Sequence, residues 1–270
     1  MPPRPKRSLG QNFLTSCSVA NRIVADIDLH PGDTVLEIGP GRGALTEGLA
    51  RRVGEVKGRL VLVELDDDLA MDLRTRFQGN PRVDVLHKDI LATRIADVVP
   101  RPEELEVVGN IPYNITSPIL FHILGRPRPR GILLMVQREV ADRILAEPGT
   151  RKYGALSVGV RTVAHVEKVL SVTRSAFRPQ PTVDSMVIRI RPFSPVPLDE
   201  LEESRLRNLT RALFQWRRKQ LGKILRDHPD LGLPSETIER ALAAASATPQ
   251  DRPETLSPSG FITLARAIAD

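Results

Sequence analysis

Short runs of aliphatic and β-branched residues alternate with longer segments of mixed polarity between about residues 33 and 191, which is the pattern of repeated β–α units. The run at 131–136 is apolar throughout, as expected of a strand that is covered on both faces of a parallel sheet. The segments after the first two runs, up to residue 53 and over 68–77, predict helices. The apolar runs predict five parallel strands, at 34–38, 59–64, 83–89, 106–109 and 131–136.

Two further β-rich stretches, 164–172 and 185–191, flank a loop that has no room for a crossover helix, so we expect them to pair antiparallel. The proline-rich segment 192–197 then interrupts the pattern, and the remaining sequence is typical of helices. We therefore predict an α/β, Rossmann-like fold in two domains. Residues 1–194 would form a mostly parallel seven-stranded sheet with an antiparallel terminal pair, and residues 195–270 a small all-helical domain.

The charge balance changes the picture of possible partners. The chain carries 39 basic and 33 acidic residues, a net charge of +6, which favours a polyanion such as nucleic acid. Cys17 is the single cysteine, which excludes an intramolecular disulfide and a zinc site built on paired cysteines, and the five histidines are scattered, so we expect no metal. No apolar run approaches the roughly 20 residues of a membrane span, and we expect a cytoplasmic location.

A glycine-rich turn, E-x-G-x-G-x-G at 37–43, follows the first predicted strand. Glycines such as Gly39 and Gly41 let a ligand lie against the backbone, and the spacing differs from the GxGxxG of dinucleotide-binding proteins. Glu64 ends the second strand, where it can accept hydrogen bonds from ribose hydroxyls, and Asp89 ends the third, where it can accept from an adenine amino group. These features suit S-adenosylmethionine, although an acid after the second strand equally suits NAD.

The sequence Asn-Ile-Pro-Tyr at 110–113 follows the fourth strand, at the sheet edge where such folds bind ligands. In N6 methylation of adenine, the side-chain carbonyl of Asn110 and the backbone carbonyl of Pro112 can each accept one amino hydrogen, which favours a pyramidal nitrogen. Tyr113 offers a ring on which an extruded base can stack. Aromatic residues make up only 4% of the chain, so Phe177, in a proline-stiffened loop, is a candidate for a second platform.

These motifs, taken in order, resemble those of the ribosomal RNA adenine N6-dimethyltransferases: GQNFL at 10–14, EIGPGRG at 37–43, ELD at 64–66, NIPYN at 110–114 and FRPQPTVDS at 177–185. The resemblance implies S-adenosylmethionine-dependent dimethylation of two adjacent adenosines in a hairpin loop near the 3′ end of small-subunit ribosomal RNA, late in subunit assembly. It also implies that the cofactor is covered by Gln11, Asn12 and Leu14 and contacted by Gly39, Gly41, Glu64, Asp89 and Asn110.

A basic run in the C-terminal part resembles the housekeeping branch of this family, which carries an RRK-x-L sequence there. On one continuous helix Arg217 would lie on the apolar side, so either the helix breaks near Trp216 or Arg217 is paired. Without the resemblance, a solvated helix face is the simpler interpretation of such a run. The residues that we expect to contact RNA phosphates are Arg178, Arg211, Arg217, Arg218, Lys219 and Lys223.

Three alternatives stay open from the sequence. The first is the antibiotic-resistance branch of the family, which modifies one adenine of large-subunit ribosomal RNA. The second is a non-catalytic assembly factor on the same fold, for which the complete set of cofactor and loop residues would serve no evident purpose. The third is a small-molecule methyltransferase, which would leave the basic run unexplained. We expect the partners to be small-subunit ribosomal RNA and the assembling subunit, with the protein acting as a monomer.

Overall fold

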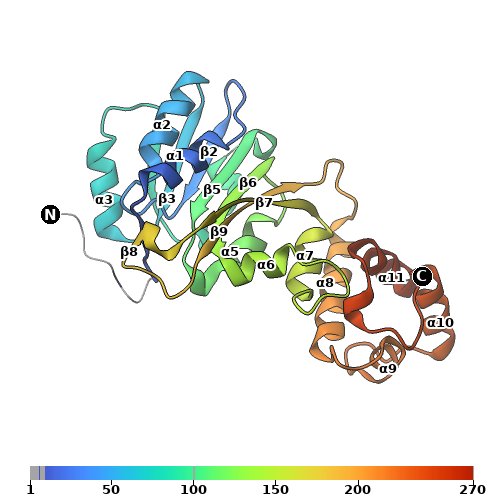
Figure 1. The fold of residues 1–270 in the computed structure, drawn as a ribbon. Helices are drawn as coiled ribbons and strands as arrows, with labels where there is room; N and C mark the ends of the chain where they lie inside the picture. Colours follow the sequence, from blue (N-terminus) through green and yellow to red (C-terminus); the bar gives the residue numbers. More distant parts are fainter. Residues whose placement is uncertain (1–5, 7–9, 100, 270) are drawn as a thin grey trace. The chain divides into compact units, whose positions relative to one another are not determined.

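The computed structural model describes residues 6, 10–99 and 101–269. A seven-stranded sheet runs through the first part of the chain in the order β4-β3-β2-β5-β6-β9-β7 (Figure 1). The strands β4, β3, β2, β5 and β6 pair in parallel, and β9 pairs antiparallel with β6. The strands are β2 (Thr34–Ile38), β3 (Arg59–Glu64), β4 (Val83–His87), β5 (Leu105–Asn110), β6 (Gly131–Gln137), β7 (Ala164–Val172) and β9 (Ser185–Pro192).

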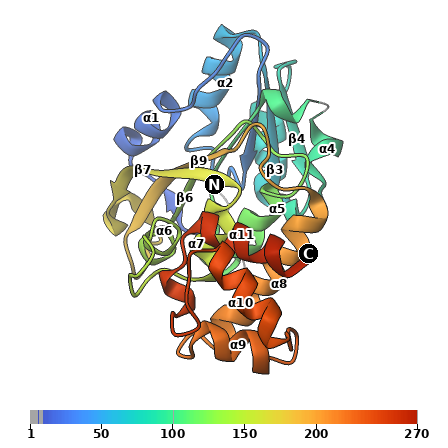
Figure 2. The ribbon, with the colours of Figure 1, turned by 90° about the vertical axis from the view of Figure 1, so that its right-hand side faces the viewer.

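Helices cover both faces of this sheet, with α1 and α2 on one side and α4 and α5 on the other (Figure 2). Most of the helices that follow a strand run back along the sheet and return the chain to the end at which the next parallel strand begins, as parallel pairing requires. The helices of this part are α1 (Cys17–Ala25), α2 (Thr46–Glu55), α3 (Asp67–Arg76), α4 (Ile95–Val98), α5 (Thr116–Ile123) and α6 (Arg138–Ile144). Among the described residues, this part also contains the short 3₁₀ turns η2 (Ile90–Ala92), η3 (Pro102–Glu104) and η4 (Tyr113–Ile115), and η5 (Arg174–Ala176) after β7.

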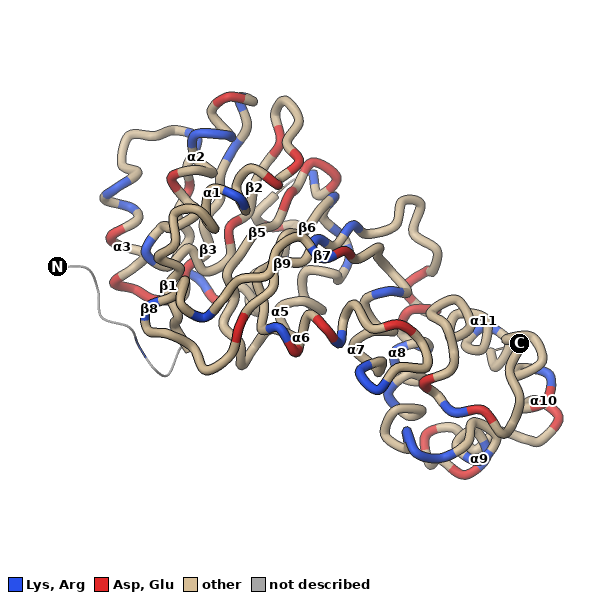
Figure 3. The backbone as a smooth tube through the Cα atoms, in the orientation of Figure 1, with Lys and Arg blue, Asp and Glu red and all other residues tan. Residues whose placement is uncertain are grey.

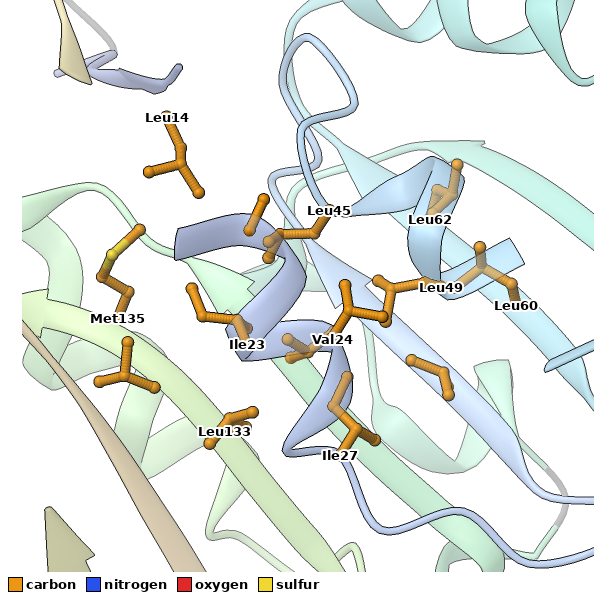
Figure 4. Packing of buried hydrophobic residues seen from close by; sticks show 14 of the residues in the cluster. Leu14, Ile23, Val24, Ile27, Leu45, Leu49, Leu60, Leu62, Leu133 and Met135 are labelled. Carbon is orange, nitrogen blue, oxygen red and sulfur yellow. The ribbon is translucent and has the colours of Figure 1, made fainter. Parts of the chain in front are cut away.

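The apolar core lies between the sheet and helices α1 and α2. Ile23 and Val24 of α1 lie among Leu45, Leu49 and Leu133 (Figure 4). Each such side chain contributes about 1.5–3 kcal/mol when it is removed from water. This core holds the strands rigidly in register, so that the loops at their carboxyl ends are presented from a fixed platform.

A two-stranded ladder outside the main sheet was not predicted. β1 (Phe13–Leu14) pairs antiparallel with β8 (Phe177–Arg178), which places Leu14 opposite Phe177. The backbone N–H of Thr15 extends the ladder by donating to the carbonyl of Ala176 at 2.8 Å. The start of the described chain is thereby tied to the loop between β7 and β9.

The chain divides into two compact units, and the second consists of residues 142–166 and 193–270. This division differs from the boundary expected at residue 195, because residues 142–166 group with the C-terminal helices. Within this unit the fully buried Tyr153 donates its hydroxyl to the carbonyl of Leu256 at 2.8 Å. The helices of this unit are α7 (Ala155–Arg161), α8 (Glu200–Gln215), α9 (Leu221–Asp227), α10 (Ser235–Ala244) and α11 (Pro258–Ala269), with the turn η6 (Pro253–Thr255).

The predicted fold class, a mostly parallel seven-stranded sheet followed by a helical region, is confirmed. In the described part of the chain no helix is both long enough and apolar enough to cross a bilayer.

Candidate active site

A pocket of about 320 Å³ lies at the carboxyl ends of the parallel strands. Its walls come from the glycine turn after β2, the end of β3, the loops after β4 and β5, and the N-terminal segment, by which we mean residues 10–14. This is the edge at which open α/β sheets bind ligands. The residues predicted to bind the cofactor all line it: Gln11, Asn12, Leu14, Gly39, Gly41, Glu64, Asp89 and Asn110.

The glycine turn has a backbone that other residues adopt poorly. Gly39 and Gly41 have φ angles of +61° and +58°, in the left-handed region. A Cβ atom at Gly41 would also lie 3.1 Å from the ring of Phe13, which belongs to the N-terminal segment. The turn therefore needs glycine for its conformation and, at Gly41, for the close approach of the segment that faces it.

Glu64 is buried and both of its carboxylate oxygens accept backbone hydrogen bonds. Oε2 accepts from the N–H of Gly41 at 2.9 Å, and Oε1 accepts from the N–H of Asp66 at 2.9 Å. Burial raises the pKa of Glu64, while these hydrogen bonds oppose the rise. Each oxygen keeps a further lone pair, so the carboxylate can still accept the two hydroxyls of a ribose.

Glu37 is a second buried carboxyl in the pocket wall, and its place in the glycine-rich motif predicted no role for it. It is 2% exposed, and Oε2 accepts the hydroxyl of Thr46 at 2.7 Å. Burial, and to a lesser degree the charge of Glu64, raise the pKa of Glu37 to about 8. At neutral pH the Glu37 side chain is therefore mostly protonated, and a cation entering the pocket beside it would favour the ionised form.

Asp89 lies two residues after β4, which ends at His87, rather than at the end of the strand as predicted. It is exposed and caps η2, where its Oδ1 accepts from the N–H of Leu91 at 2.8 Å. The apolar side chains of Ile90 and Leu91 line the pocket directly after it. Ile90 and Leu91 were not predicted as site residues. An apolar pair immediately after an acid at a strand end was the available signal, because a planar aromatic ligand needs apolar neighbours beside its polar partner.

The amide of Asn110 has a defined orientation at the end of β5. Its Nδ2 donates to the backbone carbonyl of Asn12 at 3.0 Å, which leaves Oδ1 as the acceptor available to a ligand. The carbonyl of Pro112 already accepts two long hydrogen bonds, from the hydroxyl of Thr116 at 3.2 Å and the N–H of Ile115 at 3.3 Å. To accept an amino hydrogen as predicted, Pro112 would have to give up one of them.

The two aromatic candidates differ in accessibility. Tyr113 is half-buried, lines the pocket and shares a 2.7 Å hydrogen bond with the hydroxyl of Ser185 on β9, which holds its ring in place. Burial raises the pKa of Tyr113. Phe177 is fully buried in the core, so in this conformation its ring presents no face to a base. The prediction that Phe177 stacks on a base therefore requires the loop after β8 to open.

The chain matches the family model described as ribosomal RNA adenine dimethylase over residues 4–244. The chain belongs to this family. It is also similar to proteins named ribosomal RNA small subunit methyltransferase A: 41% identical over 268 residues in Geobacter metallireducens, covering 98% of this chain and 96% of the relative, and 40% identical over 271 residues in Levilactobacillus brevis, covering 97% and 89%.

Two solved structures agree with the family. A dimethyladenosine transferase from Plasmodium falciparum superposes with a TM-score of 0.76 at 25% identity, covering 93% of this chain and 95% of that chain. The 23S rRNA methyltransferase ErmE superposes with a TM-score of 0.72 at 29% identity, covering 96% and 100%. Family membership confirms the predicted enzyme class, and with it S-adenosylmethionine as the methyl donor.

The predicted RNA-binding residues of this family member lie mostly in the second unit. Helix α8 ends at Gln215, and Arg217 is also paired: its Nη2 donates to the carbonyl of Thr150 at 3.3 Å and its Nε lies 3.7 Å from a carboxylate oxygen of Glu254. Both explanations offered for Arg217 therefore apply. Arg218 and Lys219 are exposed in the turn between α8 and α9, where Figure 3 shows a cluster of basic positions.

The other predicted RNA-binding residues are exposed as well. Arg211 donates to Oδ1 of Asn208 at 3.2 Å, and Lys223 lies 4.0 Å from a carboxylate oxygen of Asp227. In the first unit, Arg178 on β8 donates to the carbonyl of Phe177 at 2.8 Å. Such exposed contacts hold a side chain weakly, so these side chains can turn toward a phosphate at little cost.

Proposed function

We propose that this protein transfers methyl groups from S-adenosylmethionine to the N6 amino groups of two adjacent adenosines in the 3′-terminal hairpin loop of small-subunit ribosomal RNA, during late subunit assembly. The observation that carries the proposal is the meeting of the oriented Asn110 amide and the Glu64 carboxylate in one pocket. The similarity to small-subunit methyltransferases over nearly the whole chain supports the choice of RNA.

The residues of the pocket fit this cofactor. S-adenosylmethionine, when bound, supplies an activated methyl group on a sulfonium. Glu64 has lone pairs left for the ribose hydroxyls, and Asp89, with Ile90 and Leu91 beside it, suits an adenine ring and its amino group. Glu37 is placed to become ionised when a cationic amino group enters, so we expect cofactor binding near neutral pH to release a proton, and this release to disappear well above pH 8.

In the chemical step, the chain's own residues position the target nitrogen. Asn110 Oδ1 accepts one amino hydrogen and, once a hydrogen bond is released, the Pro112 carbonyl accepts the second, which directs the nitrogen lone pair toward the methyl group. Tyr113 stacks on the base. As the bond from the nitrogen to the methyl carbon forms, the bond from that carbon to the sulfonium sulfur would break and leave a neutral thioether. The methylated nitrogen is then acidic and its proton leaves to solvent, so a strong general base is not required. Catalysis then rests mainly on in-line positioning.

We assign the chemistry to the first unit and contacts with the subunit to the second unit, residues 142–166 and 193–270, through Arg211, Arg217, Arg218, Lys219 and Lys223, with Arg178 near the reacting base. The exposure of Arg218 and Lys219 supports this assignment. The ion pair of Arg217 with Glu254 suggests that Arg217 shapes the turn that presents its two neighbours. The protein would act in the cytoplasm, where subunits are assembled, and as a monomer.

The alternative, methylation of large-subunit RNA, is not favoured, because the relatives at about 40% identity are named small-subunit methyltransferases, whereas ErmE is 29% identical. The test is transfer of labelled methyl groups to purified, undermethylated small subunits, with protein-free large-subunit RNA assayed in parallel. We expect label in two adjacent adenosines of the small subunit and none in large-subunit RNA. Label only in large-subunit RNA would favour the resistance branch, and transfer to neither would favour a binding factor without catalysis.

A further inference from the structure

An ionic cluster outside the proposed chemistry lies where the N-terminal segment meets the loop between β3 and α3. The Nζ atom of Lys6 lies 2.8 Å from Asp66 Oδ1, 3.3 Å from Asp67 Oδ1 and 3.0 Å from Asp68 Oδ2. The Asp66 side chain is only 1% exposed, whereas that of Lys6 is 37% exposed. A buried carboxylate needs compensation for lost hydration, and Lys6 provides part of it.

Asp66 is bonded on both of its oxygens. Besides Lys6, Oδ1 accepts from the backbone N–H groups of Asp68 and Leu69 as the N-cap of α3, at 3.1 and 3.4 Å. Oδ2 accepts from Nε2 of Gln11 at 2.9 Å, and the other end of that amide accepts from the backbone N–H of Lys6 at 2.7 Å. Burial acts to raise the pKa of Asp66, but the hydrogen bonds from Lys6, Gln11 and Leu69 outweigh it, and the net pKa is lowered.

Hydrogen bonds connect this cluster to residues that line the pocket, Glu64 and Gln11. The backbone N–H of Asp66 donates to Glu64, the carboxylate assigned to the ribose. Next to Gln11 in the chain, the backbone carbonyl of Asn12 accepts a hydrogen bond from the side-chain amide of Asn110. Gln11, Asn12 and the residues up to Leu14 all line the pocket, whereas Lys6 and Asp66 do not. The contacts of Lys6 and Asp66 thus act on the pocket through the N-terminal segment.

We propose that Lys6 and Asp66 are positioning residues that hold the N-terminal segment over the cofactor, so that cofactor affinity depends on this ionic contact; this inference rests on the proposed function. The other end of the segment is held independently, by the β1–β8 ladder and the Asn12–Asn110 hydrogen bond. Loss of Lys6 therefore weakens binding of the cofactor while the orientation of Asn110 is kept.

The decisive variant is Lys6→Met, which keeps the length and apolar stem of the side chain and removes its charge. We expect the Kd for S-adenosylhomocysteine, measured by calorimetry without RNA, to rise about fivefold, since a charge-assisted hydrogen bond is lost at a half-exposed site. The KM for the methyl donor should rise by the same factor, and kcat at saturating donor should stay within about twofold. The matched control is Lys152→Met, which removes an exposed lysine that pairs with Asp142 at 2.7 Å in the other unit.

Two further measurements separate positioning from general stability. The Kd of the parent for S-adenosylhomocysteine should rise as the salt concentration rises. The Kd of Lys6→Met should rise less, because Lys6, the exposed partner of the ion pair, is gone. In an Asp66→Asn background, which can still cap α3, Lys6→Met should have a smaller effect than in the parent, because only the ion pairs of Lys6 with the exposed Asp67 and Asp68 remain to be lost. An unchanged Kd in Lys6→Met, or equal losses in Kd and kcat, would overturn the inference. Failure of the parent protein to bind S-adenosylhomocysteine at all would instead overturn the proposed function.

Discussion

Replacing Asn110 with alanine removes two contacts whose contributions can be separated. The Nδ2 hydrogen bond to the carbonyl of Asn12, at 3.0 Å, supports the folded state and is worth about 1 kcal/mol. Oδ1 is the acceptor assigned to the amino group of the target adenine, a contact that tightens as charge develops. Loss of one such preorganised contact costs about 100- to 1000-fold in kcat, or roughly 2.7–4 kcal/mol.

We expect Asn110→Ala to lower single-turnover methyl transfer about 100- to 1000-fold, while the Kd for S-adenosylhomocysteine changes far less. The control is Asn21→Ala, an exposed asparagine on α1, which should keep the parent rate. Asn110→Asp is the sharper test, because it keeps an acceptor but sets a carboxylate oxygen against the carbonyl of Asn12. If Asn110→Asp retained the parent rate, the role assigned to the Asn12 contact would be refuted.

Three further outcomes follow from the same structure. Burial raises the pKa of Glu37 to about 8, so the stabilisation from its neutral form is fully present below the pKa of the unfolded chain and is lost as pH rises through about 8. In denaturant titrations, the free energy of unfolding of Glu37→Gln should therefore increase relative to that of the parent between about pH 5 and 8. A difference that stays constant over this range would contradict the raised pKa. Tyr113→Phe loses only the hydrogen bond to Ser185 and should keep most of the methylation rate, whereas Tyr113→Ala, which removes the ring, should lose most of it; equal rates would contradict stacking. Neutralising Arg218 and Lys219 together should weaken subunit binding and flatten its salt dependence, measured by filter binding over a salt series, and an unchanged slope would count against phosphate contacts.

The strands and the pocket could be predicted because each depends on local sequence. The apolar run at 131–136 falls within β6, and the glycine turn takes the left-handed φ angles that only glycine adopts readily. The position of that turn at a strand's carboxyl end then follows from the rules of parallel sheets. This is why the residues proposed for the cofactor were found to line one pocket.

Other features depend on contacts between distant segments, which local patterns do not encode. The β1–β8 ladder is two residues long on each side, too short for any periodicity to reveal. The aromatic character of Phe177 indicated a platform, yet the ladder and the core enclose its ring. Lys6 and Asp66 are separated by 60 residues, and nothing in either neighbourhood marks them as partners.

The helical unit is assembled from two stretches of chain, 142–166 and 193–270, and this limits how it can be exchanged between relatives. A chimera that replaced only residues 195–270 would set a foreign helical core against the native Tyr153, whose ring is fully enclosed and whose hydroxyl needs the carbonyl of Leu256. Such a hybrid leaves a buried donor without its acceptor, a cost of about 1–3 kcal/mol, unless the incoming sequence supplies the same loop. Because the unit is built from two separate stretches of chain, a chimera that exchanges it between relatives has to move both stretches together.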